Sequence, residues 1–165
     1  MSSSRPDTVA TNRDVDSKEN IDKFIRAKEA TTCDNLLLDG SISNADVRNE
    51  YGQSGLHAIP GIGSRNKDID IDILISYLLT CDPPADVNGR NSWGYTPMLL
   101  AAYHNKTSAV KVLIDFGGDR TIKSNNDDLY CSNMTPLDMA KREANKKANN
   151  QEIIKLLTEC FPSEE

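Results

Sequence analysis

Side chains that could do chemistry are few in this 165-residue chain, and their spacing matches no common site. Histidine can act as a general base or a metal ligand, but His57 and His104 stand far apart in the sequence. Gly61-Ile62-Gly63 lacks the third glycine and the preceding strand of a phosphate-binding loop. The cysteines are widely spaced, without the Cys-x-x-Cys pair that is typical of zinc sites; they are Cys33, Cys81, Cys131 and Cys160.

One acidic segment resembles the start of a calcium loop. Asp68, Asp70 and Asp72 have the required spacing, but Ile73 and Leu79 stand where that loop needs a glycine and a glutamate. The segment therefore predicts a solvated acidic loop. Because no serine or cysteine lies in a motif that marks a nucleophile, we expect a protein that is not an enzyme and that holds no metal or cofactor.

Composition narrows the class of partner. The net charge is −6, whereas a nucleic-acid surface carries a basic stripe and attraction to anionic lipid requires basic residues. No apolar run is long enough to cross a bilayer, and the first six residues lack the apolar core of a signal peptide. Unpaired thiols fit a reducing compartment. We expect a monomeric, cytoplasmic or nuclear protein whose partner is another protein, with no nucleic acid and no membrane.

The clearest structural signal is a helix start at Thr96. Its hydroxyl is suited to accept a hydrogen bond from the first helical turn, and Pro97 fits the first helical position because its missing N–H costs nothing there. Two alanines follow within the same short run and leave room for another helix to approach closely. The pattern returns at Thr135-Pro136 and, in weaker form, at Ser54-Gly55.

Each of these starts is followed by a second apolar helix, expected over residues 71–79, 108–116 and 151–159. A turn followed by two short helices, with a Thr-Pro-x-x-x-Ala type of start, resembles the ankyrin-repeat family, whose unit has about 33 residues. The three starts are 42 and 39 positions apart, so we expect polar insertions at about residues 61–70, 82–84, 125–132 and 143–150. The resemblance implies an all-α fold, an α-solenoid of stacked helix-turn-helix units with long connecting turns. It also implies that His57, at a motif position, hydrogen-bonds to neighbouring turns.

This resemblance divides the chain into a disordered N-terminal tail over residues 1–17, an ankyrin-repeat domain over 18–160 and a C-terminal tail over 161–165. Within the domain we expect four units, at about 18–48, 49–90, 91–124 and 125–160. The first unit is expected to contain helices over 17–29 and 32–38. The helix that begins at Leu56 is expected to stop before Pro60, because proline followed by glycine interrupts regular structure.

In the ankyrin family, the tips of the turns and the inner helices line a concave face that binds partner proteins. The matching positions are rich in aromatic residues, in a chain with only 5% aromatics, and tyrosine and tryptophan are common interface anchors. The candidate partner-binding residues are Tyr51, Gln53, Trp93, Tyr95, Tyr103, His104, Met134 and Arg142. The resemblance thus implies a protein–protein interaction module, a scaffold or adaptor. Alternatively, the rings pack on neighbouring turns and only cover the stack.

Two other functions remain open from the sequence. One is an accessory subunit or small enzyme with a pocket under the loop at residues 61–70. The other is a chaperone-like assembly factor that binds one client.

Overall fold

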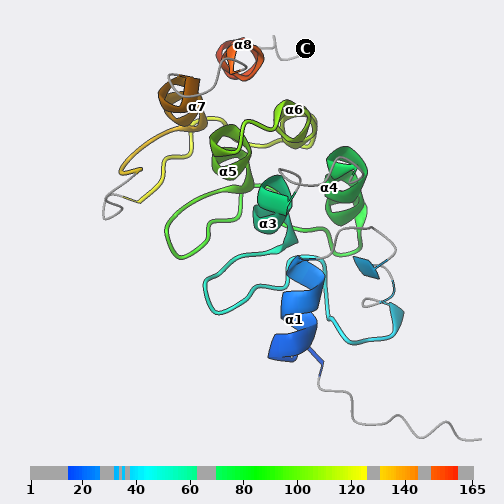
Figure 1. The fold of residues 1–165 in the computed structure, drawn as a ribbon. Coiled ribbons are helices and arrows are strands. Elements are labelled where there is room, and N and C mark those ends of the chain that lie inside the picture. The colour runs from blue at the N-terminus through cyan, green and yellow to red at the C-terminus, as the bar shows by residue number, and fades with distance from the viewer. Residues whose placement is uncertain are drawn as a thin grey trace, which may run out of the picture.

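The computed structural model describes residues 15–26, 32–33, 35, 38–62, 70–125, 131–144 and 150–159. In these segments the chain forms seven helices and no strand (Figure 1). The helices are α1 (Lys18–Ile25), α3 (Gly55–Ile62), α4 (Ile71–Thr80), α5 (Pro97–Tyr103), α6 (Thr107–Asp115), α7 (Pro136–Ala144) and α8 (Gln151–Thr158). The predicted all-α fold is therefore confirmed.

The helices form a stack with two layers (Figure 1). In the inner layer α1 packs on α3, α3 on α5 and α5 on α7, and in the outer layer α4 packs on α6 and α6 on α8. The two layers are joined by contacts within the pairs α3–α4, α5–α6 and α7–α8. This is the predicted solenoid of helical hairpins.

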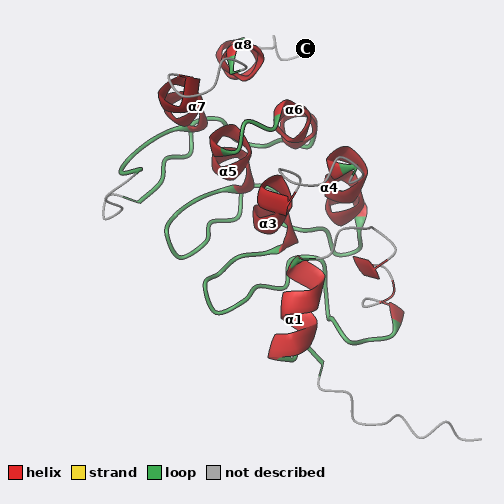
Figure 2. Ribbon diagram, viewed as in Figure 1, coloured by secondary structure: helices red, strands yellow, loops and turns green. Residues whose placement is uncertain are grey.

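Long loops project to one side of the stack, beside the inner helices (Figure 2). We name them finger 1 (residues 49–54), finger 2 (residues 91–96) and finger 3 (residues 124–135). Each finger leads directly into an inner helix, so the last residues of a finger determine where that helix begins.

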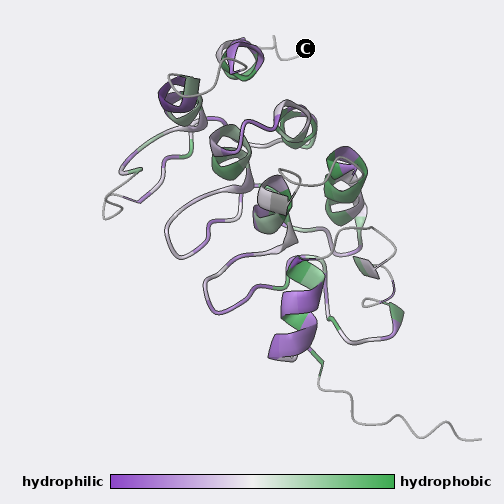
Figure 3. Ribbon diagram, in the orientation of Figure 1, coloured by the Kyte–Doolittle hydropathy of each residue, from purple (hydrophilic) through white to green (hydrophobic). Residues whose placement is uncertain are grey.

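Small and aliphatic side chains allow the helices to stack. Ala101 and Ala102 are fully buried on α5, which is contacted by α3, α6 and α7. Leu99 and Leu113 are also fully buried and come from the two helices of the same unit. The central helices α4 and α5 consist mainly of hydrophobic residues in Figure 3, whereas α7 contains more hydrophilic residues.

Helix α5 depends on its predicted cap, and we expect Thr96→Ala to lower the free energy of unfolding by about 1 kcal/mol. The Thr96 hydroxyl oxygen accepts a hydrogen bond from the Leu99 N–H at 3.3 Å, and alanine would leave that donor without its partner. Chemical denaturation measures the change. Thr80→Ala is the control, because Thr80 is exposed and its hydroxyl donates to carbonyls of its own helix. Equal losses in both variants would contradict a capping role.

One expected helix boundary is wrong. Helix α3 does not stop before Pro60 but runs through it to Ile62. Proline holds a φ value that suits a helix, and in this short helix its missing N–H removes a single backbone bond, to the carbonyl of Leu56. The segment 63–69, where the first long insertion was expected, lies outside the described residues.

The described backbone begins at residue 15, within the last three positions of the tail expected over 1–17. In it the N–H of Asp16 donates to the carbonyl of Ser41 at 3.0 Å. The hydroxyl of Ser17 accepts from the Asn20 N–H at 3.2 Å and caps α1. The remaining tail positions, 1–14 and 161–165, and parts of the expected helices at 17–29 and 32–38 lie outside the described residues.

Candidate functional site

A side-chain amide determines the shape of finger 2. The Oδ1 atom of Asn91 accepts hydrogen bonds from the backbone N–H groups of Trp93, at 3.1 Å, and Tyr95, at 2.9 Å. Asn49 makes the equivalent two bonds in finger 1. An asparagine side chain that bonds to the backbone ahead of it is a common way to stabilise a turn. The aromatic residues of finger 2 are therefore presented by a fixed loop.

Finger 3 is longer than the other two and brings a cysteine inward. A backbone hydrogen bond from the Ser124 N–H to the Met134 carbonyl joins its two ends, which are ten positions apart. The equivalent bond of finger 2, from the Asn91 N–H to the Tyr95 carbonyl, joins residues only four positions apart. The Ser124 hydroxyl donates to the carbonyl of Cys131 and accepts from the Met134 N–H at 3.1 Å. The N–H of Asn125 donates to the carbonyl of Trp93 at 3.3 Å, which ties finger 3 to finger 2. Most of the insertion expected at 125–132, residues 126–130, lies outside the described residues.

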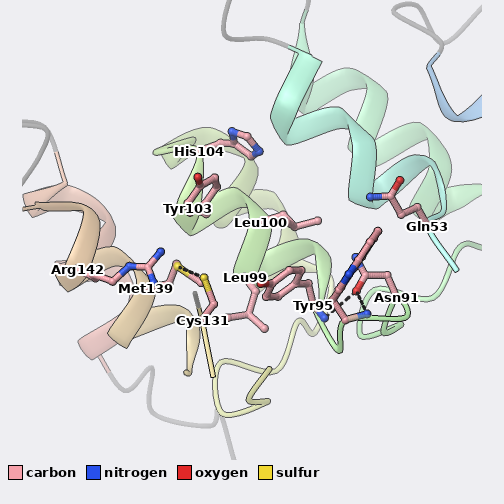
Figure 4. A pocket seen from close by; sticks show the side chains of 11 residues that line it. Gln53, Asn91, Tyr95, Leu99, Leu100, Tyr103, His104, Cys131, Met139 and Arg142 are labelled. Carbon is pink, nitrogen blue, oxygen red and sulfur yellow. Dashed lines mark hydrogen bonds between the residues drawn. The ribbon is translucent and has the colours of Figure 1, made fainter. Parts of the chain in front are cut away.

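A groove of about 640 Å³ lies between these fingers and the inner helices α5 and α7 (Figure 4). Six of the eight candidate residues line it: Gln53, Trp93, Tyr95, Tyr103, His104 and Arg142. The other lining residues are Asn91, Leu99, Leu100, Cys131 and Met139. Positions that are scattered over 90 residues of sequence are therefore gathered into one surface with an apolar floor and aromatic walls.

The two remaining candidates lie next to the groove without lining it. Tyr51 stacks on Trp93 across the tips of fingers 1 and 2, with ring centroids 5.7 Å apart and planes 17° from parallel. The Sδ atom of Met134 lies 3.8 Å from Nη1 of Arg142. Tyr51 and Trp93 thus pack on each other across neighbouring turns, yet they remain 50% and 43% exposed. The two rings at the tips of fingers 1 and 2 therefore stack on each other and still leave aromatic surface exposed to solvent.

Five lining residues were not among the eight candidates: Asn91, Leu99, Leu100, Cys131 and Met139. Asn91 could have been found, because Asn49 and Asn91 occupy equivalent positions five residues before Ser54 and Thr96. The three apolar residues gave no such signal, because leucine and methionine at helical spacing are typical of a core. Leu99 and Met139 are in fact almost fully buried beneath the groove.

Arg142 supplies the charge of the groove. Its Nε and Nη2 atoms donate to the Glu143 carboxylate at 3.4 and 3.3 Å. Burial works against the charge of Arg142, but hydrogen bonds with Cys131 and Glu143 outweigh it and raise the pKa of the guanidinium. The side chain of Glu143 is only 5% exposed, compared with 30% for Arg142. The positive end of this pair is therefore the end that faces the groove (Figure 4).

His57 lies outside the groove and has the structural role that was predicted. Its Nδ1 atom accepts from the Ser54 N–H at 3.2 Å, and Nε2 lies 3.1 Å from the carbonyl oxygens of Gly89 and Tyr95. Because an N–H can only donate, this network assigns the ring proton to Nε2. Burial, helped by the nearby charge of Arg48, lowers the pKa of His57 to about 4. The neutral imidazole thus joins α3 to finger 2.

Within the acidic segment Asp70 has a local structural role, whereas Asp68 lies outside the described residues. The carboxylate of Asp70 accepts from the Ile73 N–H at 3.2 Å and caps α4. Across the described segments, no three His, Cys, Asp or Glu side chains gather in a way that could hold a metal ion. Nor does any helix in that part of the chain have the length and apolar character needed to span a membrane. The pocket considered under residues 61–70 involves positions 63–69, which are outside the described residues.

Comparison with known proteins points to one family. A family model described as ankyrin repeats (3 copies) matches residues 64–164, which is more than half of the chain. A protein from Rickettsia bellii (strain RML369-C), named for its ankyrin repeats, is 33% identical over 66 residues. That match covers 40% of this chain and 36% of the relative, so the similarity spans about a third of the relative's length.

Proposed function

The chain belongs to the ankyrin-repeat family, and from that premise we propose that it is a non-catalytic interaction module that binds a protein in the groove beside finger 2. Ankyrin repeats generally mediate protein–protein interaction. The groove supplies what a protein interface needs, which is aromatic anchors around an apolar centre with a few polar groups. A scaffold or adaptor role, a monomeric state and a cytoplasmic or nuclear location belong to the same proposal.

The observation that carries the proposal is the exposure of large aromatic side chains on a fixed surface. Trp93 and Tyr103 are 43% and 40% exposed, and both line the groove. Trp93 is on a finger whose backbone is pinned by Asn91, and Tyr103 is on a helix, so little conformational entropy remains to be lost when a partner binds. Burying these exposed aromatic side chains, which are already held in place, therefore favours binding of a protein partner.

We expect Trp93→Ala with Tyr103→Ala to abolish capture of the partner while the helical circular dichroism is unchanged. Interface anchors of this kind each contribute roughly 2 kcal/mol or more, which corresponds to about thirtyfold in affinity for each residue. Affinity purification followed by mass spectrometry compares the wild type with the double variant. Tyr95 is left intact because it packs partly against the core.

Phe116→Ala is the matched control for that experiment. Phe116 is 40% exposed, like Tyr103, but it caps the C-terminal end of the outer helix α6 and does not line the groove. A partner of the groove should be lost with the double variant and retained with Phe116→Ala. Equal recovery of every bound protein from all three forms would contradict the proposal.

A further inference from the structure

We propose that Arg90 is a positioning residue for the partner-binding groove, because its side chain holds finger 3 against finger 2, as Arg48 holds finger 2 against finger 1. The part of this inference that concerns binding rests on the proposed function, since both involve the same groove. The contacts that support this role recur between successive fingers.

Arg48 and Arg90 occupy equivalent positions in their units. Each stands directly before the asparagine that shapes its finger, Asn49 or Asn91. Lys123 stands at the same place before finger 3. Stacking of the units therefore brings the starts of the three fingers side by side.

Each arginine side chain joins two fingers through backbone carbonyls. Nη1 of Arg48 donates to the carbonyl of Gly52 in its own finger, at 3.5 Å, and to the carbonyl of Arg90 at the start of the next finger, at 3.0 Å. In the same way, Nε of Arg90 donates to the carbonyl of Gly94 at 3.4 Å, and its Nη2 donates to the carbonyl of Lys123. A planar guanidinium with five donors serves two carbonyls at once, and its charge strengthens each bond.

A backbone bond joins the same fingers at a second point. The Ser92 N–H donates to the carbonyl of Tyr51 at 3.0 Å, and the Asn125 N–H donates to the carbonyl of Trp93 at 3.3 Å. A single bond would leave the next finger free to pivot, whereas two separate attachments also fix its direction. Finger 2 supplies Trp93 to the groove and finger 3 supplies Cys131, so the relative position of these two lining residues depends on both attachments.

Arg90 is better suited to a test by substitution than Arg48. The Arg48 guanidinium is also bound by the carboxylate of Asp46, at 2.9 Å, and a side chain at Gly89 would collide with it. Arg90 is exposed, and it lines a hollow separate from the groove. A substitution of Arg90 therefore changes the attachment of finger 3 without removing a side chain from the groove.

The alignment of the fingers is tested by amide hydrogen exchange, measured by nuclear magnetic resonance on the full chain. We compare the wild type with Arg90→Gln and Arg90→Lys, since lysine keeps the charge but lacks the planar fork. In both variants the Asn125 N–H should exchange roughly tenfold faster than in the wild type, because a charge-assisted attachment of finger 3 is lost. The Ser92 N–H should exchange at an unchanged rate, because Arg48 and the backbone carbonyl of Arg90 remain.

Lys111→Gln is the matched control for these variants. Lys111 is an exposed cation whose bond to Glu152, at 2.7 Å, joins α6 to α8 in the outer layer. This variant should leave the exchange of both finger amides unchanged. The denaturation midpoints of the Arg90 variants should match that of Lys111→Gln, because the helices and their core are intact.

The effect on binding is measured with one purified protein, chosen because the wild type captures it and the Trp93→Ala, Tyr103→Ala double variant does not. Its affinity for both Arg90 variants should be roughly tenfold weaker than for the wild type, because fingers that are no longer aligned must be ordered when the partner binds. Its affinity for Lys111→Gln should equal its affinity for the wild type.

The outcomes separate the role of Arg90 from the proposed function. If the Asn125 N–H exchanges at the wild-type rate in both Arg90 variants, or if Arg90→Lys behaves as the wild type, the role of the guanidinium is overturned. If exchange is faster but affinity is unchanged, Arg90 does not position the groove, and the proposed function still stands. If no captured protein depends on Trp93 and Tyr103, the proposed function fails, and the inference about binding fails with it.

Discussion

The free energy of unfolding is expected to fall by about 3 kcal/mol as the pH drops from 7 to 4, because folding keeps His57 neutral. In the unfolded chain the imidazole has a pKa of 6.5, whereas burial in the fold lowers the pKa to about 4. Below pH 6.5 the unfolded state therefore binds a proton that the folded state does not accept until about pH 4. The contribution of His57 is complete above pH 6.5 and is lost across that interval.

The magnitude follows from the size of the shift, since each pKa unit corresponds to about 1.4 kcal/mol. The contacts explain why protonation is resisted. A second proton on His57 would occupy Nδ1, which already accepts the N–H of Ser54. Hydrogen bonds from Thr135 and Thr121 lower the pKa values of Asp138 and Asp119 below 3.8, so those carboxylates lose their contribution only at more acidic pH.

Guanidinium chloride denaturation at pH 7, 5.5 and 4 measures this effect. His57→Gln should be less stable than the wild type at pH 7 and should show a flatter profile between pH 6.5 and 4. Nuclear magnetic resonance of labelled histidine gives the pKa of His57 directly. A value near 6.5, together with pH-independent stability in this interval, would contradict the expectation.

The repeat explains how much of the structure could be predicted. Thr96 and Pro97 define a helix start by local chemistry alone, and the recurrence of that start implies stacking. Stacking in turn places equivalent positions of neighbouring units side by side. Tyr51 and Trp93 are 42 positions apart, the same interval that separates Ser54 from Thr96, and they stack on each other in the structure. The gathering of the candidate residues in one groove follows from the same register.

The course of finger 3 and the different burial of Arg142 and Glu143 depend on tertiary packing, which no local sequence pattern encodes. The extra length of finger 3 was visible in the sequence, but its direction is determined by the bond from Asn125 to Trp93 and by the hydroxyl of Ser124. Arg142 and Glu143 are adjacent in the sequence, yet one opens into the groove and the other is buried. That difference arises from how α7 is seated on α5, which is a tertiary property.

The contact between fingers 2 and 3 depends on the absence of a side chain at Gly94. This glycine has a φ of +76°, in the left-handed region, and a Cβ atom built on it would lie 2.7 Å from the backbone nitrogen of Asn125. The equivalent residue of finger 3 is Asn133, which also has a positive φ, of 54°. Asparagine tolerates this conformation, and within the described residues no fourth finger lies against it.

We expect Gly94→Ala to lower the free energy of unfolding by about 3 kcal/mol, whereas Gly117→Ala should lower it by only about 1 kcal/mol. Gly117 has a similar φ, of +81°, but a Cβ atom there would meet nothing within 4 Å. The two variants therefore share the backbone strain and differ in the clash with finger 3. Chemical denaturation of both variants, with capture of the protein partner compared by affinity purification, separates the effect of the clash from that of the backbone strain. Gly94→Ala should also weaken capture because finger 3 must move, and Gly117→Ala should not. Equal stability losses with unchanged binding would show that finger 3 does not depend on its close approach to finger 2.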